Sequence, residues 1–135
     1  MPVAKELTIR LEDRPGTLGK ICRALAEEKV NIVAFQSIPF EGRGLVRFVA
    51  DNLATAKKVL DNEGLSYQET DVVLARLPHR PGELARAASR LGEVDININY
   101  AYSGVDLSAN TPLVILGVTD AGQAAVILDR AAAAA

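Results

Sequence analysis

The chain has 135 residues, enough for one ordinary domain or two very small ones, and its 49% hydrophobic and 24% charged residues are typical of folded globular proteins. Its formal charge of −2 leaves no surplus of basic residues to neutralise phosphates, so we expect neither nucleic acid nor a membrane surface as a partner. The longest apolar stretch, 113–118, is far shorter than the roughly 18 residues that span a bilayer, and the first residues lack the apolar core of a secretory signal. We therefore expect a cytoplasmic protein.

The residue types that usually carry catalysis are scarce. One cysteine and one histidine exclude an internal disulfide and a multi-cysteine metal site, and no dinucleotide-binding or phosphate-binding glycine motif occurs. Cys22 falls on the apolar face of a predicted helix, which favours a small core residue over a nucleophile. His79 lies in a predicted loop and either contacts a ligand or is solvated. We expect no catalytic residue, no metal, no cofactor and no enzymatic activity.

An internal repeat organises the chain. The Arg-Pro-Gly segment that begins at Arg14 aligns without gaps on the one that begins at Arg80, and the same offset of 66 residues places Val-Asn-Ile at 30–32 on Ile-Asn-Ile at 96–98. Two extra residues enter the second copy after Ser103. The sequence therefore predicts two copies of one unit, at 1–70 and 71–135.

The first half of the unit contains a strand and a helix. Residues 6–12 alternate between apolar and polar, which is typical of a strand with one face on a core. In 17–29 the apolar residues recur at helical spacing, and Leu84, Ala87, Ala88 and Leu91 repeat that stripe in the second copy. The two segments are expected to be amphipathic helices.

The second half of the unit contains two strands, a helix and a short strand. Residues 30–38 and 45–50 are apolar and β-branched, and proline and glycine residues between them predict a turn. Asn52 is a plausible N-cap for a helix that ends near Gly64, and Asp120 marks the same start in the second copy. A short strand at 65–69 runs almost directly into the first strand of the next copy.

This order of elements predicts an α+β fold of two tandem ferredoxin-like βαββαβ units, each with an antiparallel sheet and its helices on one face. A unit of about 66 residues has a marginal core, so pairing, and a homodimer, are expected. The second copy ends in a run of alanines, which favours continuation of its last helix, and no fourth strand follows. That unit either works with three strands, borrows a strand, or belongs to a longer natural chain.

Two features of the unit could bind a ligand. The Pro-Gly turn leads into a helix N-terminus, whose free N–H groups suit a carboxylate, although tight turns also need Pro-Gly for geometry alone. Asn31 and Asn97 are polar at the start of apolar strands, where a buried amide without partners is costly. Asn31 either caps the preceding helix or contacts a ligand. The turn and the asparagine lie at opposite ends of one helix, so a shared ligand would require an interface between units.

Both copies resemble the ACT domain, because Asp-Arg-Pro-Gly-Thr-Leu is followed some fifteen residues later by Val-Asn-Ile and the pattern occurs twice. The resemblance covers nearly the whole chain. It implies a regulatory module that binds a small molecule, usually an amino acid, between paired domains. It also implies a rival role, in which the chain is a regulatory subunit that controls a separate biosynthetic enzyme.

Carried over position by position, the resemblance implies these ligand-binding residues: Asp13, Arg14, Pro15, Gly16, Thr17, Leu18, Asn31 and Ile32 in the first copy, and Arg80, Pro81, Gly82, Glu83, Leu84, Asn97 and Ile98 in the second. The second copy departs from the pattern, with His79 for the aspartate and Glu83 for Thr17. Because the anionic Glu83 would repel a ligand carboxylate near the helix end, we expect the first copy to bind more strongly.

Overall fold

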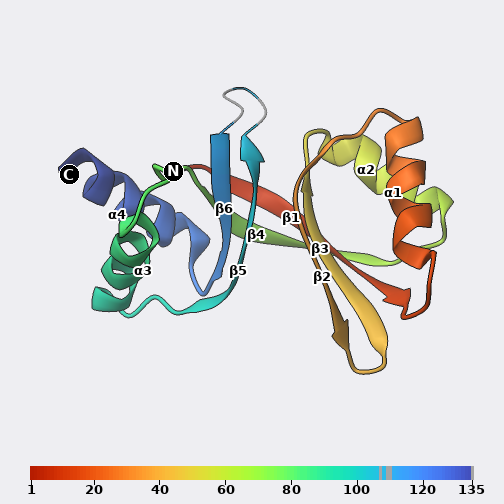
Figure 1. Ribbon diagram of the computed structural model, residues 1–135, viewed down its shortest axis with the longest axis horizontal. Coiled ribbons are helices and arrows are strands. Elements are labelled where there is room, and N and C mark those ends of the chain that lie inside the picture. Colours follow the sequence, from red (N-terminus) through yellow and green to blue (C-terminus); the bar gives the residue numbers. More distant parts are fainter. Residues whose placement is uncertain (107, 109–110, 135) are drawn as a thin grey trace. The chain divides into compact units, whose positions relative to one another are not determined.

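The computed structural model describes residues 1–106, 108 and 111–134. The chain divides into a first unit, Lys5–Thr70, and a second unit, which combines Met1–Ala4 with Asp71–Ala135. The described residues form six strands, antiparallel in their pairs, and four helices (Figure 1). The predicted α+β class is confirmed.

The first unit follows the predicted order of elements. Its elements are most of β1 (Val3–Glu12), α1 (Thr17–Glu27), β2 (Ile32–Phe40), β3 (Arg43–Ala50), α2 (Leu53–Asn62) and the beginning of β4 (Tyr67–Ala75). The short strand expected at 65–69 is the start of β4, which continues without a break into the second copy. The predicted N-cap of α2 is confirmed, because Asn52 Oδ1 accepts a hydrogen bond from Thr55 N at 3.1 Å.

The sheet of the first unit places β3 between β1 and β2. Ile9 pairs with Val46, and Phe35 pairs with Phe48. The hairpin between β2 and β3 turns at Glu41 and Gly42, both at positive φ, as a tight hairpin turn requires. One cluster of buried side chains joins β1 and β3 to both helices, and it includes Leu25 of α1 and Leu60 of α2.

The second unit repeats this arrangement. Its elements after β4 are α3 (Glu83–Glu93), β5 (Ile98–Asp106), β6 (Thr111–Val118) and α4 (Ala121–Ala134). Here β6 lies between β4 and β5, and α3 and α4 pack against it around Leu91, Leu116 and Leu128. Asp120 Oδ1 accepts a hydrogen bond from Gln123 N at 3.0 Å, which confirms the predicted start of α4. The alanine run continues the helix, as expected.

The last strand of the second unit is present, so the alternative in which this unit works with three strands is wrong. Leu74 N in β4 donates a hydrogen bond to Pro2 O at 3.0 Å, and Met1–Ala4 belong to this unit. Met1 packs against the second core cluster. The sequence downstream of Arg130 could not reveal this, because the residues beside β4 come from the opposite end of the chain.

One core assignment is also wrong. Leu84 was expected on the buried stripe of α3, but its side chain is 54% exposed, and the neighbouring Glu83 is buried instead. Ala87 and Leu91 are buried as predicted. Compared with the prediction, α3 is therefore rotated about its axis, so that the carboxylate of Glu83 points inward instead of the Leu84 side chain.

An ion pair between a buried carboxylate and a half-exposed arginine lies at the end of β5. Asp106 is 6% exposed, its carboxylate accepts a hydrogen bond from Arg76 Nε, and the Ser108 hydroxyl donates to it at 2.8 Å. Two hydrogen bonds lower the pKa of Asp106 from its ordinary 3.8 to about 2, the larger effect coming from Arg76 and the smaller from Ser108.

No helix in the described part of the chain is long and apolar enough to cross a membrane.

Leu91→Ala should lower the free energy of unfolding by about 2–5 kcal/mol, because Leu91 is fully buried and the change leaves a cavity. Leu84→Ala on the same helix is the matched control and should cost about 0.5 kcal/mol or less, as at other exposed sites. Urea unfolding followed by circular dichroism measures both. Equal losses would contradict the orientation of α3.

Asp106→Asn should lower the free energy of unfolding at pH 6. A carboxyl whose pKa is lower in the folded state stabilises the fold above its unfolded pKa, and that contribution is lost as the pH falls through its folded pKa. The difference between wild type and variant should therefore narrow as the pH falls from about 4 to about 2. Urea unfolding across this range measures it, and a constant difference would rule out the charge as its origin.

Candidate functional site

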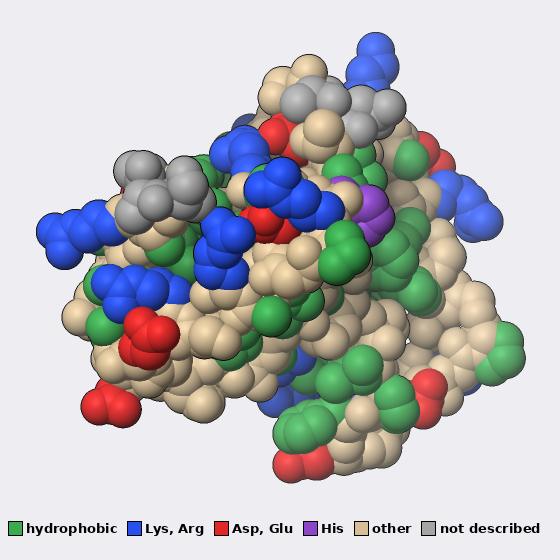
Figure 2. Space-filling model, turned by 60° about the vertical axis from the view of Figure 1, so that its left-hand side comes forward, with side chains coloured by type: hydrophobic (Ala, Val, Ile, Leu, Met, Phe, Trp, Pro, Cys, Tyr) green, Lys and Arg blue, Asp and Glu red, His purple; other side chains and the backbone are tan. Residues whose placement is uncertain are grey.

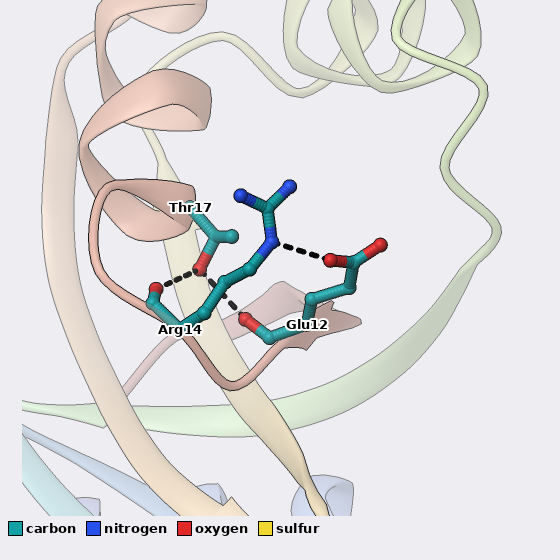
Figure 3. A network of polar contacts seen from close by, with 3 residues as sticks. All are labelled: Glu12, Arg14 and Thr17. Atoms are coloured by element: carbon teal, nitrogen blue, oxygen red, sulfur yellow. Dashed lines mark hydrogen bonds and ion pairs between the residues drawn. The ribbon is translucent and has the colours of Figure 1, made fainter.

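The first Pro-Gly turn is closed by its own side chains. Gly16 has φ 93°, a left-handed conformation that favours glycine, and the helix α1 begins at the next residue. Thr17 Oγ1 donates to Glu12 O at 2.8 Å and lies 3.1 Å from Arg14 O (Figure 3). Arg14 Nε donates to Glu12 Oε2 at 2.5 Å, and this contact lowers the pKa of Glu12. Thr17 and Arg14 are thus engaged within the turn.

The second turn has the same backbone and different contacts. Gly82 has φ 89°, and α3 begins at Glu83. Arg80 Nε donates to Glu83 Oε1 at 2.6 Å, and Arg86 Nη2 lies 3.7 Å from the same oxygen. Glu83 is 8% exposed. A buried carboxylate between two guanidinium groups replaces the hydroxyl of the first copy.

Both turns leave backbone N–H groups open. A glycine N-cap has no side chain to accept from the first turn of its helix, and the first helical hydrogen bonds are donated by Lys20 N and Arg86 N. Within the described residues, the N–H groups of Leu84 and Ala85 have no acceptor, like the corresponding groups in α1. Helices α2 and α4, in contrast, are capped by side chains. An anion from outside the chain could cap α1 and α3.

The open N–H groups of α3 belong to residues that line a cavity of about 510 Å³, here called the turn cavity. Its walls are the segment 77–85 and residues of β5 and β6, among them Ser103, Leu113 and Val114. A Cβ placed on Gly82 would meet no described atom within 4 Å, so the backbone there is accessible. The turn cavity contains five of the residues expected to bind a ligand: Arg80, Pro81, Gly82, Glu83 and Leu84.

The remaining predicted residues of the second copy lie elsewhere. Asn97 is exposed, and its side-chain amide donates to Asn99 Oδ1 at 2.8 Å. Ile98 packs against the second core cluster. Neither residue lines the turn cavity, in agreement with the expectation that the turn and the asparagine lie at opposite ends of one helix.

Asn31 does not have the buried side chain that the sequence suggested. It is exposed, and no hydrogen bond of its side-chain amide is formed within the described residues. Its backbone is tied instead, because Asn31 N donates to Asp51 Oδ1 at 2.9 Å and Asn31 O accepts from Asp51 N at 3.0 Å. The cost of a buried amide therefore gives no reason for Asn31 to bond within the chain.

The predicted residues of the first copy are divided between two smaller cavities. Leu18 and Ile32 line an apolar cavity of about 120 Å³, together with Cys22. Arg14 and Thr17 line a polar cavity of about 270 Å³, here called the first-unit polar cavity. Asp13, Pro15 and Gly16 are exposed in the turn.

The two residues noted for possible chemistry are placed as follows. Cys22 is partly buried against the apolar face of α1, as expected, and burial raises the pKa of its thiol. His79 is exposed and lines the turn cavity. Among the residues that the structure describes, no group of three histidine, cysteine or acidic side chains could hold a metal ion.

Arg76 and Arg86 were missed by sequence reasoning, although both line a cavity beside the second turn. The repeat carried a signal for them. Arg76 and Arg86 fall on Arg10 and Lys20 of the first copy, so both copies keep a positive charge at both positions.

Several solved structures are similar to this chain. Protein BT0572 from Bacteroides thetaiotaomicron has a similar structure with a TM-score of 0.84 and 28% sequence identity, over 95% of this chain and 88% of that one. The ligand-free regulatory subunit of aspartate kinase from Thermus thermophilus has a TM-score of 0.63 at 19% identity, over 96% of this chain and 91% of that one. Aspartokinase alpha and beta subunits give 0.58 at 16% identity, over 97% of both chains.

The two aspartate kinase structures, at 19% and 16% sequence identity, share the fold of this chain. Among curated proteins, no sequence matches this chain significantly. The family model for the ACT domain pair matches residues 1–132. The resemblance seen in the two Arg-Pro-Gly turns is thereby confirmed over nearly the whole sequence, and the chain belongs to the ACT domain pair family.

Proposed function

We propose that this chain is a non-catalytic regulatory protein made of two tandem ferredoxin-like ACT units, which bind an amino acid. The observation that carries the proposal is the turn cavity, which places the uncapped start of α3 against an open space of about 510 Å³. Pockets of roughly 300–1,000 Å³ are the usual size for small ligands. The family, a regulatory ligand-binding module, supports the same role.

The chemistry of the turn cavity fits an amino acid at its carboxyl end. The N-terminus of a helix carries roughly half a positive charge, and the open N–H groups of Leu84 and Ala85 would donate to a carboxylate. The walls contributed by Leu77, Leu113 and Val114 would contact an apolar side chain. Because Glu83 is already held by Arg80, its charge is partly offset at this helix end.

The cavity favours the second copy over the first as the stronger site. The charge of Glu83 had suggested the reverse, but the buried carboxylate is compensated by two arginines. In the first copy, the predicted residues are divided between smaller cavities. Asn31 and Asn97 are exposed and would contribute only where another unit covers them.

A homodimer would supply that cover. Strand β2 carries three exposed hydrophobic side chains, Phe35, Ile38 and Phe40, of which Phe35 is 53% exposed. Burial of large aromatic side chains is a principal source of affinity in protein interfaces. We propose that β2 of two copies contributes to the dimer contact.

A second candidate function is a regulatory subunit for a separate biosynthetic enzyme. It is favoured by the structural likeness to the aspartate kinase regulatory subunit, which extends over 96% of this chain. A free sensor binds an amino acid by itself, whereas a subunit co-purifies with its enzyme and changes its rate. Affinity purification from the native cell separates the two roles.

Gly82→Asp should abolish amino-acid binding at the turn cavity, because it adds a negative charge where the ligand carboxylate approaches α3. Gly82→Asn is the matched control, since asparagine has nearly the same shape as aspartate, carries no charge and tolerates the left-handed backbone. A thermal-shift screen of the common amino acids measures binding, because a ligand at ~100 times its dissociation constant stabilises by ~2.7 kcal/mol.

Gly16→Asp makes the same change in the first copy and should have the smaller effect on binding. A larger loss from Gly16→Asp would place the stronger site in the first copy. No stabilisation of wild type by any amino acid would reject the proposed function itself.

Light scattering should give a dimer of the 14.4 kDa chain at micromolar concentration. Phe35→Ser combined with Phe40→Ser should shift the protein toward the monomer, because both changes remove apolar contact area from β2. A monomeric wild type would remove the proposed cover over Asn31 and Asn97.

A further inference from the structure

Three arginines line a second cavity in the second unit, here called the arginine cavity. Its volume is about 290 Å³, and its charged walls include Arg76, Arg80 and Arg86. Leu77, Ala87 and Leu128 supply apolar surface. Figure 2, which brings the α3–α4 side of the view forward, shows basic side chains gathered around acidic ones beside hydrophobic surface. The cavity therefore combines positive charge with an apolar wall.

Two buried carboxylates hold the arginines in place. Glu83 accepts from Arg80 Nε at 2.6 Å, and Asp106 accepts from Arg76 Nε. Both contacts use Nε, so the terminal nitrogens of Arg76 and Arg80 have no hydrogen-bond acceptor within the described residues. Arg86 Nη2, 3.7 Å from Glu83, is beyond hydrogen-bond distance. Several donors from preoriented guanidinium groups are thus available to a ligand.

The first copy shows what this arrangement adds. Arg10, Arg14 and Lys20 occupy the equivalent positions and line the first-unit polar cavity. Thr17 and Phe40, however, stand where the second copy has Glu83 and Asp106. The Thr17 hydroxyl bonds only to backbone carbonyls, and Phe40 is 44% exposed. Both copies keep three basic residues, and only the second has buried carboxylates that orient them.

Buried carboxylates are costly unless they are paired, and each here is paired with an arginine of the cavity wall. The lining residues include three guanidinium groups and one carboxylate, Glu83. With Asp106 paired to Arg76 and Glu83 paired to Arg80, the three guanidinium groups leave one positive charge in excess beside a half-open space. That excess favours an anion, and planar guanidinium groups suit a carboxylate.

We propose that the arginine cavity binds a small organic anion, a carboxylate with a short apolar body. The carboxylate would accept hydrogen bonds from Arg86 and the terminal nitrogens of Arg76 and Arg80, and the apolar body would pack on Leu77, Ala87 and Leu128. The arginine cavity and the turn cavity share residues of the segment 77–83. The other walls of the arginine cavity come from α3 and α4, whereas those of the turn cavity come from β5 and β6.

The charges of the cavity distinguish this ligand from related ones. An amino acid would place its ammonium among three guanidinium groups, with the one lining carboxylate already held by Arg80. Inorganic phosphate would satisfy the donors and leave the apolar wall uncovered. A neutral amide of the same shape would lose the charge. The proposal does not depend on the proposed function at the turn cavity.

Isovalerate is the probe. Calorimetry measures its affinity, and amide chemical shifts locate it on the full chain. Arg86→Gln should weaken isovalerate binding about tenfold or more. The reason is that loss of one hydrogen bond to a charged group typically raises a dissociation constant at least tenfold. Lys20→Gln, the matched change in the first copy, should leave the affinity unchanged. Arg86 is 52% exposed, so its replacement should preserve the fold, which circular dichroism checks.

The expected result is isovalerate binding with shifts at the amides of Ala87 and Leu128, and at least tenfold weaker binding of isovaleramide, leucine and phosphate. Four results would overturn the proposal: no binding of isovalerate at millimolar concentration, equal binding of isovaleramide, equal effects of Arg86→Gln and Lys20→Gln, or shifts confined to Ser103 and Val114. The last result would move the ligand to the turn cavity.

Discussion

The left-handed glycine at the start of α1 and α3 is the constraint on which both turns depend. Gly16 at φ 93° and Gly82 at φ 89° turn the chain from strand to helix in a conformation that is costly for residues with a Cβ. Apart from the glycine itself and its chain neighbours, no described atom lies within 4 Å of a Cβ built at either position, so the requirement comes from the backbone and not from crowding. The same glycine that allows the turn also removes the capping side chain. The tight turn and the open N–H groups therefore have the same cause, a glycine at the N-cap.

The two copies close this common turn by different chemistry. In the first, the Thr17 hydroxyl reaches two carbonyl groups, and Arg14 pairs with an exposed Glu12. Exposed ion pairs contribute little to stability, so that turn is held chiefly by the hydroxyl and the backbone. In the second, Glu83 is buried and takes its partner from the wall of a cavity. Loss of Arg80 would leave the buried charge of Glu83 without its hydrogen bond. The stability of this turn therefore depends on an arginine that also lines the cavity beside it.

Local features of the sequence predicted the fold well, because they depend on neighbouring residues. The caps at Asn52 and Asp120 need an acceptor three residues before a free N–H, and both formed as expected. The last strand of the second unit could not be predicted in this way, since the hydrogen bond between Leu74 and Pro2 joins residues about half the chain apart. The burial of Glu83 in place of Leu84 was missed because an apolar stripe is assigned by residue type alone, whereas Glu83 is stabilised inside by ion pairs with Arg80 and Arg86, three residues before and after it.

The candidate site was predictable only in part, for a related reason. The repeat identified the turn residues, and five of them line one cavity. Asn31 was misjudged because an apolar sequence around a polar residue does not fix which way its side chain points. The segment 77–83 has a further property that no single motif reveals, since Arg80 and Glu83 line both the turn cavity and the arginine cavity. A ligand that draws Arg80 away from Glu83 in one cavity changes the charge presented to the other. If binding at either site changed this ion pair, the two sites would be coupled, and thermodynamic reciprocity would then require each ligand to change the binding of the other by the same factor.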